Sequence, residues 1–113
     1  METPVASSPI LHLTSESFNS VILSAEEAVV DFWAEWCGPC QRFAPVFEAL
    51  SVEYPGVQFC KCNTDENPDI AQEFCIYSIP TILFIKNGKV IRIESGAMSA
   101  EEFRTILTEI FLS

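Results

Sequence analysis

Two cysteines separated by two residues, in Trp36-Cys37-Gly38-Pro39-Cys40, have the most evident chemistry in this sequence. Thiols at this spacing can close into a small disulfide ring and open again. Gly38 and Pro39 bend the backbone, and the apolar spacing that follows them predicts a helix. The first turn of a helix has unpaired N–H groups and the positive end of the dipole, which favour a thiolate over a thiol. Because a thiolate is the attacking species in thiol–disulfide exchange, the motif predicts a redox centre.

The two thiols are expected to have different roles. Cys37 precedes the helix and follows a loop-like stretch, so we expect it to be the nucleophile. Cys40 lies one turn inside and is expected to attack the mixed disulfide on Cys37 and release the reduced substrate. A sheltered thiol needs a proton acceptor, and Asp31 is a candidate because a buried carboxylate has a raised pKa. Alternatively, Asp31 is a strand-end residue bonded to turn amides.

The elements that position these residues are indicated by periodicity and by turn residues. Strands are expected at residues 10–13, 28–33 and 57–62, and helices from residues 14–15 to 23, from the redox motif to before residue 55, and over residues 67–74. Asn87-Gly88 between residues 81–86 and 89–94 predicts a hairpin with a type I′ turn. Ser99 and Glu102 form a capping box for a last helix.

This order of elements predicts an α/β fold in which a central five-stranded mixed sheet is flanked by four helices. At 113 residues the chain is expected to form one domain, residues 10–113, after a flexible Ser/Pro-rich arm at residues 1–9.

Charge and cysteine usage restrict the function. The net charge of -10 argues against nucleic acid as a partner. No Lys or Arg precedes Arg42, which indicates either a solvated acidic surface or a field that steers basic partners. No apolar stretch approaches membrane-spanning length, and residues 1–9 do not read as a secretory signal. Five cysteines without such a signal favour a reducing compartment, so we expect a cytoplasmic protein.

The sequence resembles the thioredoxin family over roughly residues 10–112. Residues 30–40, which end in the Cys37–Cys40 ring, are similar to the active-site signature of that family. Further matches occur in family order and spacing at Lys61-Cys62-Asn63, Ser78-Ile79-Pro80-Thr81, Lys86-Asn87-Gly88 and Gly96-Ala97. The resemblance implies the thioredoxin fold and a protein-disulfide reductase with no bound cofactor, because the two sulfurs carry the electrons.

The resemblance also implies the surroundings of the ring. It places Asp31 and Lys61 together beneath Cys40, where Lys61 modulates the pKa; alternatively, Lys61 is a snorkelling or edge-strand lysine. It implies a cis peptide bond at Pro80 that faces the cysteines and leaves the Ile79 backbone free to pair with an extended substrate; alternatively, Pro80 is only a proline at the start of a strand. The remaining residues would form a flat apolar docking surface: Trp36, Gly38, Pro39, Ile79, Pro80, Gly96 and Ala97. No metal site is expected.

The partners implied by the resemblance are a thioredoxin reductase that draws on NADPH and disulfide-containing substrates such as peroxiredoxins or ribonucleotide reductase. We expect a monomer with no nucleic-acid or membrane partner. Two positions depart from the family pattern: Gln41 replaces a usual Lys or Arg, and Tyr77 stands where a polar or basic residue is common.

Three extra thiols need a separate interpretation. Cys60 and Cys62 are expected to be small buried hydrophobes, since a disulfide between them would strain an extended strand. Cys75 is expected near a helix end, as an idle or a regulatory thiol. The non-enzymatic alternative is a zinc-binding module that uses Cys37, Cys40, Cys60 and Cys62. An oxidase or isomerase would more often have His between the cysteines, and a glutathione-linked enzyme would favour Pro-Tyr in the ring.

Overall fold

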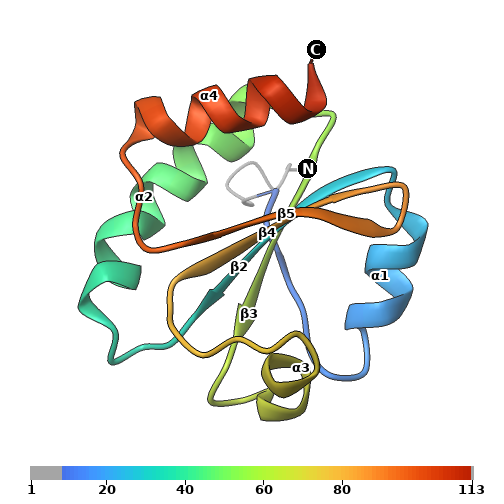
Figure 1. Ribbon diagram of the computed structural model, residues 1–113, viewed down its shortest axis with the longest axis vertical. Coiled ribbons are helices and arrows are strands. Elements are labelled where there is room, and N and C mark those ends of the chain that lie inside the picture. The colour runs from blue at the N-terminus through green and yellow to red at the C-terminus, as the bar shows by residue number, and fades with distance from the viewer. Residues whose placement is uncertain (1–8, 113) are drawn as a thin grey trace, which may run out of the picture.

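The computed structural model describes residues 9–112 (Figure 1). Residues 1–8, which are most of the expected arm, lie outside the described residues, as does Ser113. The elements follow in the order β1 (Leu11–His12), α1 (Phe18–Ser24), β2 (Glu27–Trp33), α2 (Gly38–Glu53), β3 (Gln58–Asn63), α3 (Pro68–Glu73), β4 (Thr81–Lys86), β5 (Lys89–Ser95) and α4 (Ala100–Phe111).

The five strands form one mixed sheet in the order β1-β3-β2-β4-β5. Strands β1, β3 and β2 are parallel, whereas β4 runs antiparallel to β2 and β5 antiparallel to β4. The predicted five-stranded mixed sheet with four helices is therefore confirmed. In the register between β2 and β3, Asp31 lies opposite Lys61.

Helices cover both faces of the sheet, with α2 and α4 on one side and α1 and α3 on the other (Figure 1). Alternate residues of a strand point to opposite faces, so each strand contributes to two cores. Under α2 and α4, buried aromatic rings stack around Phe47 and Phe103, whose centroids lie 5.8 Å apart. The second core joins α1 and α3 to the other face through Phe18 and Ile70.

Local signals explain the hairpin and the last helix. Asn87 and Gly88 both have positive φ, 52° and 80°, as the predicted type I′ turn requires. The Ser99 hydroxyl accepts the N–H of Glu102 at 3.1 Å, and the Glu102 carboxylate accepts the N–H of Ser99 at 3.0 Å, so the predicted capping box is present.

The structure moves the start of the first helix, expected at Thr14 or Ser15, and keeps Asn67 as the N-cap of α3. Helix α1 begins only at Phe18, because Thr14 Oγ1 accepts the N–H of Ser17 in a turn that precedes the helix. Asn67 is the N-cap residue of α3 and Pro68 begins the helix, but the Asn67 side chain makes no capping hydrogen bond. Its amide oxygen instead accepts the N–H of Ser15 at 2.9 Å, and this bond ties the segment before α1 to the segment before α3.

Candidate active site

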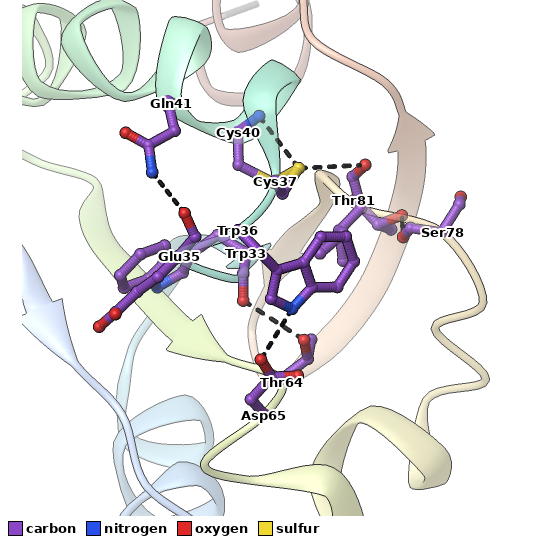
Figure 2. Close-up of a disulfide and its surroundings, with 11 residues drawn as sticks. Trp33, Glu35, Trp36, Cys37, Cys40, Gln41, Thr64, Asp65, Ser78 and Thr81 are labelled. Carbon is purple, nitrogen blue, oxygen red and sulfur yellow. Dashed lines mark hydrogen bonds between the residues drawn. A yellow bond between two sulfur atoms is a disulfide. The ribbon is translucent and has the colours of Figure 1, made fainter.

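The two motif cysteines form a disulfide at the start of α2 (Figure 2). Cys37 is the N-cap residue of this helix, with extended backbone angles, and Pro39 lies in its first turn. The N–H of Cys40 donates to Cys37 Sγ at 3.2 Å, so the sulfur takes the place of a capping oxygen. An N–H at this place and the positive end of a helix dipole favour a thiolate over a thiol.

The two cysteines do not differ in exposure, although Cys40 was expected to be the sheltered one. Cys37 is 4% exposed and Cys40 is 2% exposed, so both are buried in the oxidised protein. What differs is their position on α2, because Cys37 precedes the first turn and Cys40 lies within it. Cys37 Sγ also lies 3.7 Å from the carbonyl oxygen of Ile79, in the neighbouring loop.

Asp31 is a fully buried carboxyl group on the sheet face that α2 covers. It shares this face with Val29, which packs in the core beneath α2 and α4. Within residues 9–112, neither carboxylate oxygen of Asp31 has a hydrogen-bond partner. Burial raises the pKa of Asp31 to about 7, and the charge of Lys61 opposes part of that rise. A carboxyl group with this pKa can accept and return a proton at neutral pH.

Lys61 lies on the same face of the neighbouring strand and is almost fully buried. Its amine lies 4.5 Å from the centre of the Trp33 ring, which is a cation–π contact. The face of the ring offsets part of the cost of burying the Lys61 amine. Asp31 and Lys61, the two charges that interrupt the apolar stretches of β2 and β3, therefore lie side by side on one face of the sheet.

A loop before β4 faces the disulfide. The Ile79–Pro80 peptide bond is cis, and the hydroxyl of Thr81 donates to the carbonyl oxygen of Ser78 at 2.6 Å. The N–H of Gly96 donates to the carbonyl oxygen of Pro80 at 2.8 Å, which brings the loop after β5 against this segment. Gly96 has φ of +98°, a conformation that a larger residue rarely adopts.

The expected docking residues differ in their exposure. Trp36 is 71% exposed, Gly38, Pro39, Gly96 and Ala97 are exposed, Ile79 is half-buried and Pro80 is buried. They come from the start of α2 and the residue before Cys37, from the segment before β4, and from the loop after β5. An apolar surface of this kind, with a sulfur at its centre, can receive an extended polypeptide.

Two hydrogen bonds that hold this surface were not foreseen from the sequence. The indole N–H of Trp36 donates to the Asp65 carboxylate at 2.8 Å (Figure 2). Gln41 donates from its side-chain amide to the carbonyl oxygen of Glu35 at 2.6 Å, and so ties α2 to the loop before the motif. The bond between Trp36 and Asp65 could have been expected from the sequence. Strands β2 and β3 are parallel neighbours, so the residues that follow them meet at the same end of the sheet.

The extra cysteines do not join the redox pair. Cys60 and Cys62 point into the core under α1 and α3, on the opposite face of the sheet from α2. Burial raises the pKa of Cys60 to about 12 and that of Cys62 to about 11, so both stay protonated. Between Pro9 and Leu112 no three His, Cys, Asp or Glu side chains are grouped as a metal site requires. The zinc-binding alternative therefore has no support.

Comparison with known proteins agrees with this geometry. A sequence model of the family described as Thioredoxin matches residues 9–109. The thioredoxin of Haemophilus influenzae is 38% identical over 104 residues, which cover 90% of this chain and 97% of the relative. The thioredoxin of Chlorobaculum thiosulfatiphilum is 49% identical over 87 residues, which cover 75% and 81%.

Solved structures are similar over nearly the whole chain. The oxidised form of mitochondrial thioredoxin 3 from Saccharomyces cerevisiae has a TM-score of 0.83 at 36% identity, covering 92% of this chain and all of that one. A chain from a study of thiol resolution in yeast mitochondrial 1-Cys peroxiredoxin by the glutathione and thioredoxin systems has a TM-score of 0.84 at 34% identity, with the same coverage.

Proposed function

Since the chain belongs to the thioredoxin family and is a disulfide oxidoreductase, we propose that it reduces disulfide bonds of other proteins by exchange at Cys37 and Cys40. The observation that carries this proposal is the disulfide at the N-terminus of α2, with Cys37 Sγ in the capping position. No cofactor takes part, because the two cysteines hold the two electrons of the reaction.

The first step begins from the reduced protein. The Cys37 thiolate attacks one sulfur of the substrate disulfide, so a bond forms between Cys37 and that sulfur while the substrate S–S bond breaks. The other substrate sulfur leaves as a thiolate and takes a proton from solvent. The N–H of Cys40, which donates to Cys37 Sγ at 3.2 Å, favours the thiolate before attack.

The second step releases the substrate. Cys40 loses its proton and attacks Cys37, which forms the internal disulfide and expels the second substrate sulfur as a thiolate. Asp31 is the candidate acceptor of the Cys40 proton, because its pKa of about 7 lets it be ionised when the thiol is still protonated. The substrate gains two electrons, and the protein ends in the oxidised state that the structure shows.

A trapping experiment tests the order of attack. Cys40→Ser, in a Cys75→Ser background that removes the exposed thiol, should accumulate mixed disulfides with substrate proteins that a dithiol releases. Cys37→Ser in the same background should trap few, and should not reduce insulin above the dithiol background. Abundant adducts on Cys37→Ser with few on Cys40→Ser would reverse the two roles.

The electron donor and the substrates belong to the same proposal. We expect an NADPH-dependent thioredoxin reductase to recharge the Cys37–Cys40 disulfide, and peroxiredoxins or ribonucleotide reductase to be among the substrates. We also expect a cytoplasmic location and a role in electron transfer and redox homeostasis, as a monomer. The test is whether NADPH and such a reductase drive the reduction of insulin by this protein. If they do not, although a dithiol-reduced sample of the same protein reduces insulin, the proposed electron donor is refuted.

A further inference from the structure

A groove of about 280 Å³ opens beside the disulfide. It is lined by residues from the loops after β2 and β3 and from the segment before Pro80: Trp36, Thr64, Ile76, Tyr77, Ser78 and Ile79. The groove is continuous with the redox centre, because the carbonyl oxygen of Ile79 lies 3.7 Å from Cys37 Sγ. A polypeptide whose cysteine reaches Cys37 therefore has a neighbouring side chain within reach of the groove.

Two exposed aromatic side chains line this groove. Trp36 is 71% exposed and Tyr77 is 90% exposed, so their rings are available to a partner. The Trp36 ring is held at its polar end, because its indole N–H donates to Asp65. The neighbouring Cys75 raises the pKa of the Tyr77 hydroxyl, so the Tyr77 ring stays neutral at physiological pH.

The charge that adjoins the groove is negative. None of its six lining residues is a cation, and the exposed carboxylate of Asp65 adjoins it through its hydrogen bond with Trp36. Gln41, where the family usually has a cation, bonds instead to the carbonyl oxygen of Glu35. Arg42 of α2 lies against Gly38 and does not line the groove. The chain as a whole has a net charge of -10.

We propose that the groove binds a cationic side chain, arginine or lysine, next to the reactive disulfide of the substrate protein, and that Tyr77 determines this specificity. A guanidinium or ammonium group is attracted to the faces of the two aromatic rings, while the Asp65 carboxylate attracts its charge from a greater distance. The aliphatic stem of such a side chain fits against Ile76 and Ile79. This inference rests on the proposed disulfide reductase activity and names its substrate class.

Matched peptides test the charge. Three synthetic peptides, each with one internal disulfide, differ only beside a cysteine, where they have arginine, its neutral analogue citrulline, or glutamate. The reduced protein is mixed with each, and the second-order rate constant of reduction is measured. We expect the arginine peptide to react about two to five times faster than the citrulline peptide, from one exposed cation–π contact. The glutamate peptide should react most slowly. About 0.5 M salt should bring its rate constant closer to that of the citrulline peptide, because salt screens the repulsion between negative charges.

Variants test the residues. Tyr77→Ala should remove most of the preference for arginine over citrulline, whereas Tyr77→Phe, which keeps the ring, should retain it. Asp65→Asn should weaken the preference by removing the charge beside the groove. Glu48→Gln is the control, because it also removes one negative charge. Glu48 is exposed and lies ten residues along α2 from Gly38, which is about 15 Å, so the preference for arginine should stay unchanged.

The outcomes separate this inference from the proposed function. Equal rates for the arginine and citrulline peptides overturn the inference while leaving the oxidoreductase activity intact. A preference that survives Tyr77→Ala overturns the assignment of Tyr77. If none of the three peptides is reduced, the proposed function fails and the inference fails with it. Loss of the preference in Tyr77→Ala with normal reduction of the citrulline peptide supports both.

Discussion

Replacement of Asp31 by asparagine should stabilise the protein at alkaline pH and slow its turnover. The side chain is fully buried, and its carboxylate oxygens have no hydrogen-bond partner among residues 9–112. Burial raises the pKa of Asp31 from 3.8 to about 7, against the opposing charge of Lys61. The ionised form is thus unfavourable in the folded protein, and the variant removes the group that must ionise.

The size of the effect follows from linkage. Each pKa unit corresponds to about 1.4 kcal/mol, so a rise of about three corresponds to roughly 4 kcal/mol. Because the folded state binds the proton more tightly, the stability contributed by Asp31 is complete below pH 3.8. It falls as the pH rises, and is lost once the pH passes about 7. Asparagine has no such dependence, but its buried amide costs about 1–3 kcal/mol if it finds no partner.

The expected result is therefore a difference that depends on pH. At pH 8 the Asp31→Asn variant should be more stable than the wild type by about 1–3 kcal/mol. Between pH 5 and pH 8 the difference should change by about 3 kcal/mol in favour of the variant, whatever the amide costs. Urea unfolding of the oxidised proteins at both values measures it. Glu48→Gln, which removes an exposed carboxylate, is the control and should show no such change.

The same variant tests the role of Asp31 as a base. Loss of a general base should slow release of the substrate by about 100-fold near neutral pH, measured as decay of the mixed disulfide in stopped-flow experiments. A stability difference that is equal at pH 5 and pH 8 would refute the buried, protonated carboxyl group. An unchanged rate of release would refute its function as the proton acceptor for Cys40.

Two further predictions concern the extra thiols and the last helix. In the oxidised native protein at pH 8, iodoacetamide should modify Cys75 alone, because burial raises the pKa of Cys60 to about 12 and that of Cys62 to about 11. Mass spectrometry measures the modification of each thiol, and early modification of Cys60 or Cys62 would contradict this prediction. Ser99→Ala should cost about 1 kcal/mol in urea unfolding, because the N–H of Glu102 loses its acceptor, whereas Ser99→Thr, which keeps a hydroxyl, should cost less.

The sequence by itself determined the redox motif, the order of the elements and the hairpin. Each depends on residues within a few positions of one another. The spacing of Cys37 and Cys40 sets the ring, Asn87-Gly88 sets the turn, and the Ser99 capping box sets the start of α4. Backbone preferences and hydrogen bonds at this range act before any tertiary contact forms, so the residues specify them directly.

The tertiary structure decided which residues far apart in the sequence lie together or apart in the fold. It placed Asp31 opposite Lys61, set Cys60 on the far face of the sheet from α2, and joined Trp36 to Asp65 across 29 positions of sequence. A crossover helix separates β2 from β3, so their register depends on how that helix packs. The alternation of side chains then assigns each residue to a face, because a shift of one position in the register would exchange the two cores.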